Sequence, residues 1–125
     1  MAKKAFRATT ALDVGDIVNL FKRSMRSNKI AEMMGTGTKY HSPDASAEPA
    51  FAADPPGVSL TASLGGSHQN NSGVELYVWD RGGARELFVA PGRNLNSLGT
   101  AAKRKAKEFL NSVQASDPSA RYEEI

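Results

Sequence analysis

The sequence contains no cysteine, and this absence excludes several classes of protein at once. Disulfide-stapled folds, zinc ribbons, iron–sulfur clusters and thiol catalysis all require cysteine. Only two histidines are present, His41 and His68, which is too few for most histidine-built metal sites. We therefore expect neither a metal nor a cofactor.

Long hydrophobic runs are also missing. No segment approaches the roughly 18 consecutive apolar residues of a membrane helix, and the N-terminus turns polar without the apolar core of a secretory signal. The chain has 125 residues, of which 40% are hydrophobic and 23% are charged, as in an ordinary globular domain. We expect one cytoplasmic domain over residues 1–116, without membrane contact, followed by a polar C-terminal tail over residues 117–125.

Charge is distributed unevenly, although the net charge is only +3. Residues 1–30 contain seven basic and two acidic residues, and residues 81–116 repeat that ratio. Residues 31–80 contain one basic and six acidic residues. Two basic segments thus flank an acidic one, so local fields matter more than the total. Each basic segment could meet phosphate or an acidic partner, or could be a solvated surface.

Apolar periodicity predicts two helices. From Val14 to Met25 the apolar residues recur three and four positions apart, and Asp13 offers an N-cap before them. A second stripe runs from Leu95 to Val113 and ends before Asp117 and Pro118, where proline disfavours helix. Each pattern is typical of a helix with one face on a hydrophobic core.

Strict alternation predicts strands over residues 5–12, 58–64, 74–79 and 85–90. The last two flank paired glycines, a strong signal for a hairpin. Residues 35–57 contain four prolines and read as a long, flexible loop rich in proline, glycine and alanine. The order β-α-loop-β-β-β-α predicts an α+β fold, an antiparallel sheet of about four strands with two helices packed on one face.

The predicted hairpin register places aromatic residues on one face of the sheet. Tyr77 lies opposite Phe88 and Trp79 lies opposite Glu86, whereas the other face of both strands is aliphatic. An antiparallel sheet with one solvated face usually carries polar residues there. The aromatic face therefore needs a cover, and residues 35–57, a second copy of the chain or a ligand could each supply it.

From this face we predict a small, non-enzymatic interaction module that associates with itself or with another protein. Exposed aromatic patches mark interfaces, and symmetric dimers are the commonest oligomers. Tyr77, Trp79 and Phe88 are the predicted partner-binding residues. If the partner were a nucleic acid, the same rings could stack on bases.

The alternative prediction is a nucleic-acid-binding protein that uses the two basic segments. Arg23 and Arg26 project from the first predicted helix, away from its apolar stripe. Lys103, Arg104 and Lys107 project in the same way from the last helix. Such side chains would contact phosphates without reading sequence, although basic helix surfaces also serve solubility.

Signals for catalysis are weak. The segment from Gly35 to Lys39 lacks the spacing of a phosphate-binding loop. The hydrolase residue types His41 and Asp44 are close neighbours in a flexible loop, which rarely holds triad geometry. Glu75 and Glu86 could act as an acid–base pair only if they were buried together. We therefore assign no catalytic residue, and the sequence favours a role other than catalysis.

Overall fold

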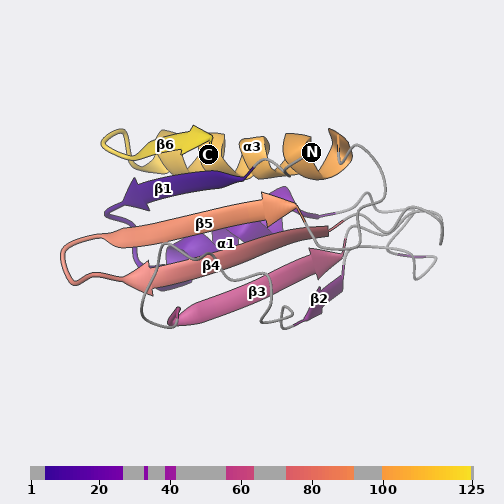
Figure 1. Ribbon diagram of the computed structural model, residues 1–125, viewed down its shortest axis with the longest axis horizontal. Coiled ribbons are helices and arrows are strands. Elements are labelled where there is room, and N and C mark those ends of the chain that lie inside the picture. Colours follow the sequence, from indigo (N-terminus) through magenta and orange to yellow (C-terminus); the bar gives the residue numbers. More distant parts are fainter. Residues whose placement is uncertain are drawn as a thin grey trace.

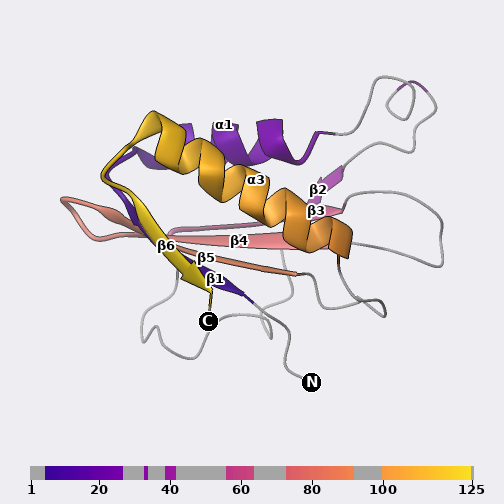
Figure 2. The same cartoon turned by 90° about the horizontal axis from the view of Figure 1, so that it is seen from above.

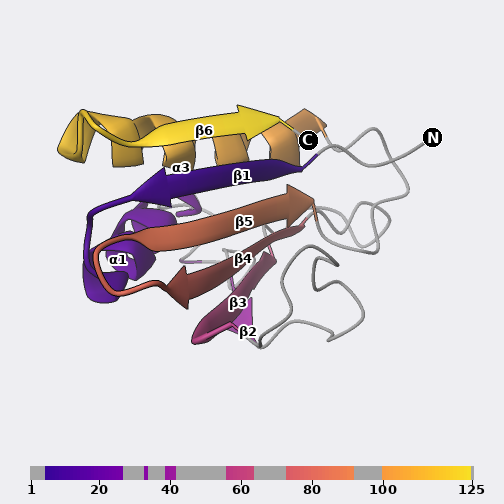
Figure 3. The same cartoon turned by 60° about the vertical axis from the view of Figure 1, so that its left-hand side comes forward.

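The computed structural model describes residues 5–26, 33, 39–41, 56–63, 73–91 and 100–124. Its elements in chain order are β1 (Phe6–Thr10), α1 (Val14–Ser24), β2 (Lys39–His41), β3 (Val58–Ser63), β4 (Gly73–Asp80), β5 (Arg85–Pro91), α3 (Thr100–Ser116) and β6 (Arg121–Glu124). The strands form one antiparallel sheet in the order β2-β3-β4-β5-β1-β6 (Figures 1 and 3). The predicted α+β class and the predicted order of the main elements are confirmed.

The number of strands was predicted incorrectly, since the sheet has six strands and not about four. Strand β2 lies within the segment 35–57, which was expected to be a loop, and β6 lies within the expected polar tail. These strands have three and four residues and form the two edges of the sheet. Runs this short give almost no alternation, so their pairing with β3 and β1 is decided by tertiary structure. Apart from residues 39–41 and 56–57, the segment 35–57 lies outside the described residues.

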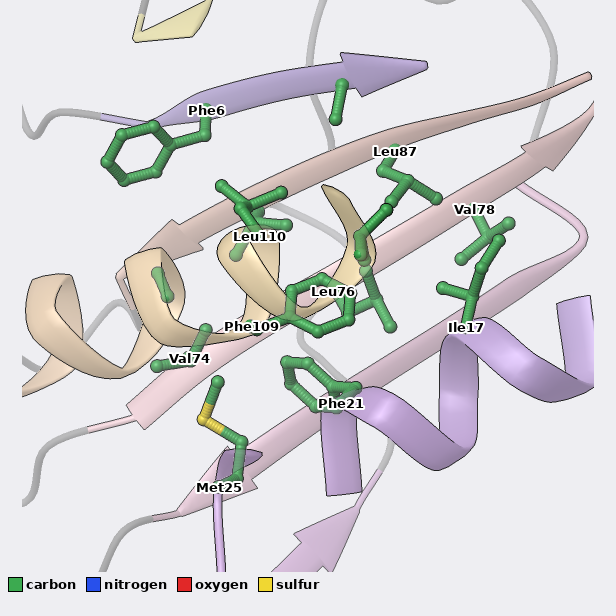
Figure 4. Close-up of a cluster of buried hydrophobic side chains, with 14 of the residues drawn as sticks. Phe6, Ile17, Phe21, Met25, Val74, Leu76, Val78, Leu87, Phe109 and Leu110 are labelled. Atoms are coloured by element: carbon green, nitrogen blue, oxygen red, sulfur yellow. The ribbon is translucent and has the colours of Figure 1, made fainter. Parts of the chain in front are cut away.

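Both helices cover the same face of the sheet (Figure 2). Ile17 and Phe21 of α1 are buried there, as the periodicity predicts, and Phe21 meets Phe109 of α3 edge-on at 5.3 Å between ring centroids (Figure 4). Leu110 is also buried, although it lies beside the predicted stripe of α3. Asp13 occupies the N-cap position of α1, but its side chain forms no capping hydrogen bond. Among the described residues, no helix is long and apolar enough to cross a membrane.

The hairpin of β4 and β5 has the predicted register, with Tyr77 opposite Phe88 and Trp79 opposite Glu86. Gly82 has a φ of +89°, a backbone conformation that residues with a side chain rarely adopt, which explains the glycine at this turn. Strand β4 has neighbours on both sides, and seven of its eight residues are buried. The aliphatic side chains of this hairpin point into the core beneath the helices (Figure 4).

A single carboxylate joins the end of α3 to the end of β1. Asp117 Oδ2 accepts hydrogen bonds from Thr10 Oγ1 at 2.7 Å and from the amide of Ala11 at 2.8 Å. Its Oδ1 accepts two more, from the amide and the hydroxyl of Ser119. The Ser119 hydroxyl, the Ala11 amide and the Thr10 hydroxyl hold the pKa of this carboxyl well below its ordinary value.

This low pKa predicts an acid-dependent loss of stability. The unfolded carboxyl titrates near ~3.9, so the contribution of Asp117 is complete above that pH and decreases as the pH falls through the lower, folded pKa. The difference in melting temperature between the wild type and Asp117→Asn should therefore shrink below about pH 4. Asp16→Asn, which removes the same charge from an exposed position of α1, is the control. A difference in melting temperature that is as large at pH 2.5 as at pH 7 would contradict this role of Asp117, because these two pH values lie on either side of the pKa of ~3.9 of an unfolded aspartate.

Candidate functional site

The three predicted partner-binding aromatics gather on the outer face, which we define as the face of the sheet turned away from the helices. Tyr77, Trp79 and Phe88 form a cluster with Ala5, and Ala90 packs at its edge. This cluster, called the aromatic cluster below, is separate from the core under the helices. The prediction that these rings share one face is confirmed by the strand register.

The rings of the aromatic cluster pack on one another. The centroids of Tyr77 and Trp79 lie 6.4 Å apart in a stacked arrangement, and those of Tyr77 and Phe88 lie 6.0 Å apart and tilted. In a single copy of the chain, Tyr77 is 0%, Trp79 2% and Phe88 8% exposed. A partner that touches these rings would therefore need this face to open. Their contact with a partner stays a prediction.

Polar groups lie beside the aromatic cluster on the outer face. Glu75 is only 4% exposed, and its Oε1 accepts a hydrogen bond of 3.1 Å from the hydroxyl of Tyr77. Thr61 lies directly opposite Glu75 in the register of β3 and β4, and its buried Oγ1 has no hydrogen-bond partner among the described residues. An unsatisfied buried hydroxyl costs about 1–3 kcal/mol.

Glu86 marks the opposite end of the aromatic cluster. Its carboxylate accepts hydrogen bonds from Arg7 Nε at 2.8 Å and from Arg81 at 3.2 Å. Partial burial raises the pKa of Glu86, but the hydrogen bonds from both arginines outweigh this effect and leave the pKa below its ordinary value. Glu86 is therefore a charged ion-pair partner at neutral pH.

The register separates the two carboxylates that were considered as an acid–base pair. Glu75 lies opposite Ala90 and Glu86 lies opposite Trp79, with the row of Tyr77 and Phe88 between them. Adjacent rows on one face of a strand are about 6.6–6.8 Å apart. Glu75 and Glu86 lie two rows apart, so their carboxyl groups cannot exchange a proton directly. The described part of this face thus provides no paired carboxylates for acid–base chemistry.

The second candidate region is the basic end of the helix layer. Cationic side chains come from the last turns of α1, the residues just after it and the first half of α3, and we call them the basic surface: Lys22, Arg23, Arg26, Lys103, Arg104, Lys105 and Lys107. On α3, Lys105 meets Arg26 on the side of α1, whereas Lys103 pairs with Glu124 on the side of β6. The predicted phosphate contacts all belong to this set. They lie on the helix side of the sheet, whereas the aromatic cluster lies on the outer face.

Helix packing brings the two basic segments together. The contact of Phe21 with Phe109 and a contact of 3.5 Å from Lys105 Nζ to the carbonyl of Arg26 show that α1 and α3 run antiparallel. The C-terminal end of α1 therefore lies beside the first turns of α3 (Figure 2). Arg26 and Lys105 are 79 positions apart in the sequence, so the sequence gives no direct signal that they meet.

The cations of the basic surface differ in their surroundings. Lys103 lies 3.6 Å from Glu124 of β6, and Lys22 lies over the ring of Tyr40. Arg104 and Lys107 form no ion pair within the part of the chain that the structure describes, and both are exposed. They border an open hollow of about 390 Å³ along α3. Unpaired, solvated cations of this kind are available to an anion.

Acidic side chains collect at the other end of the helix layer. Asp13 and Asp16 belong to the start of α1, and the Asp117 turn follows the end of α3. Asp80 lies at the tip of the hairpin, 3.0 Å from Arg85, whose guanidinium also donates to the carbonyl of Leu12 before α1. These carboxylates thus lie away from the basic surface, where Glu124 pairs with Lys103 and Glu108 with Lys105.

No protein-family model matches the chain, and no curated protein matches its sequence. The basic surface therefore has to be interpreted from its own geometry. The sequence indicated five of its seven cations, but not Lys22 and Lys105. Tertiary packing decides where both lysines lie. Lys105 contacts the carbonyl of Arg26 just after α1, and Lys22 lies over the ring of Tyr40 in β2.

Proposed function

We propose that the chain is a non-enzymatic nucleic-acid-binding module that contacts the phosphate backbone through its basic surface. The observation that carries the proposal is the antiparallel packing of α1 on α3, which brings the basic end of α1 beside the basic half of α3. Arg104 and Lys107 supply exposed cations without carboxylate partners among the described residues. Phosphate contacts of this kind give affinity without sequence selectivity.

The composition of the basic surface favours a phosphate backbone over a folded protein partner. Protein interfaces are built around a buried apolar or aromatic centre. Among the described residues the only large hydrophobic side chain that is strongly exposed is Met33, which belongs to neither helix of this surface. A surface of cations without such a centre suits a polyanion, whose binding is driven by counterion release.

Association through the aromatic cluster remains the second candidate. It is supported by the gathering of three rings on one face, but their burial requires that face to open first. The nucleic-acid proposal needs no such opening, since five of the seven cations are already exposed. The aromatic cluster lies on the opposite face of the sheet, so it takes no part in the proposed phosphate contacts.

The proposal predicts strongly salt-dependent binding. With five phosphate contacts, from Arg23, Arg26, Lys103, Arg104 and Lys107, a plot of log K against log salt should have a slope of about −4.5 on duplex DNA. The slope should be shallower on single strands, and unrelated sequences should bind alike. Fluorescence anisotropy with labelled 20-mer oligonucleotides (about two helical turns) measures this from about 50 to 200 mM salt.

A pair of variants tests whether the basic surface makes the contacts. Arg104→Gln combined with Lys107→Gln should make the slope shallower by about 2, because two counterion-releasing contacts are lost. Ala115→Glu, at the other end of α3, makes the net charge more negative and should leave the slope unchanged. No binding at about 50 mM salt, or equal slopes for the wild type and the double variant, would refute the proposal.

A further inference from the structure

We propose that β6 is a homodimerisation edge, at which a second copy of this chain adds its own β6 antiparallel to form one continuous sheet. Strand β6 pairs with β1 on one side and is the last strand of the described sheet. An edge strand presents N–H and C=O groups that can pair with another chain. The inference is independent of nucleic-acid binding.

Contacts within the chain hold β6 in position for such pairing. Tyr122 points to the helix side, where its ring meets Phe6 edge-on at 6.0 Å and its hydroxyl donates to Asn111 Oδ1 at 3.0 Å. Arg121 and Glu123 therefore point to the outer face. Both are exposed there, at the border of an open hollow of about 370 Å³. The edge is thus anchored, and no other described strand pairs with its outer side.

The charges of β6 are complementary to a second copy in one register. In a symmetric antiparallel pair with Tyr122 opposite Tyr122 of the second copy, each Arg121 lies opposite Glu123 of the other copy on the outer face. A shift of two residues in either direction places Arg121 opposite Arg121 or Glu123 opposite Glu123. Like charges directly opposite each other are destabilising, so the side chains select the first register.

The same register extends a row of charges that is already present in each chain. Arg7 lies directly opposite Glu123 in the pairing of β1 with β6, and Arg7 also bonds to Glu86 of β5. In the dimer Glu123 would lie between Arg7 of its own chain and Arg121 of the second copy. An antiparallel edge-to-edge pair has its twofold axis perpendicular to the sheet, so both helix layers would lie on one side.

Single charge reversals and their mixture test the proposal. Solution mass is measured by sedimentation from about 10 µM to 1 mM, because a four-residue strand pair predicts a weak dimer. Arg121→Glu alone and Glu123→Arg alone each place like charges opposite each other, and each should raise the dissociation constant about tenfold or more. An equimolar mixture should restore the dimer, because Glu at position 121 then faces Arg at position 123, and the remaining Glu123 faces Arg121.

Matched controls separate this effect from folding and from total charge. Arg23→Glu changes the net charge as much as Arg121→Glu does, but lies on α1, away from β6, and it should leave dimerisation unchanged. Melting curves verify that each variant is folded. A monomer at every concentration, or a dimer that persists unchanged in both single variants, would overturn the proposal. So would a mixture that dimerises no better than its components.

Discussion

Replacing Phe21 by Ala is expected to lower the free energy of unfolding by about 3–5 kcal/mol. Phe21 is fully buried, and its ring packs edge-on against Phe109 at the crossing of the two helices (Figure 4). The truncation leaves a cavity between α1 and α3, which the surrounding β-sheet cannot fill. Urea denaturation followed by the fluorescence of Trp79, the only tryptophan, measures the loss.

Asn19→Ala is the control for this variant, because Asn19 is an exposed position of the same helix. Its effect should stay within about 0.5 kcal/mol, as for most surface substitutions. Because alanine favours helix at both positions, a difference between the variants reports packing and not helix propensity. A loss below about 1 kcal/mol for Phe21→Ala would contradict the packing of α1 on α3, and with it the joined basic surface.

Replacing Trp79 by Ala is expected to cost a similar amount, about 3–5 kcal/mol, if the aromatic cluster is closed in solution. Trp79 is 2% exposed in a single copy and stacks on Tyr77, so its removal leaves a cavity beside the Tyr77 ring. Trp79→Phe retains most of the apolar area and should lose clearly less. Circular dichroism in urea is the measurement, since both variants lack the tryptophan signal.

A loss below about 1 kcal/mol for Trp79→Ala would show that the face is open in the free chain. The predicted partner contacts of Tyr77, Trp79 and Phe88 would then gain support over the basic surface. Quenching of Trp79 fluorescence by iodide gives an independent measure in the wild type. A closed cluster excludes iodide, whereas an open face is quenched like free tryptophan.

The sequence was informative wherever an element is long enough to repeat its pattern. The stripe from Val14 to Met25 defines the buried side of α1, and the alternation around Gly82 defines the register of β4 and β5. The edge strands could not be found in this way. Three residues of β2 and four of β6 show too little alternation, and their formation depends on neighbours that are distant in the sequence.

The candidate site was predictable in its members but not in its assembly. Charge counting singled out Arg104 and Lys107, and helical periodicity placed them away from the core. Only tertiary structure shows that the end of α1 meets the start of α3, since no local rule links Arg26 to Lys105. For Trp79, the sequence predicted the face of the sheet but not the burial. Alternation placed it correctly on the outer face, but burial depends on the whole chain.

The position of β1 has a consequence for the order of assembly during synthesis. Strand β1 is made first, yet both of its partners, β5 and β6, follow it by more than 70 residues. The hairpin of β4 and β5 can form from neighbouring residues, whereas β1 must wait for it with Phe6 and Ala8 unpaired. Such non-local pairing slows folding and leaves a strand edge open to other chains. On the ribosome the N-terminal strand would therefore be the element most in need of a chaperone until residues 85–91 have emerged.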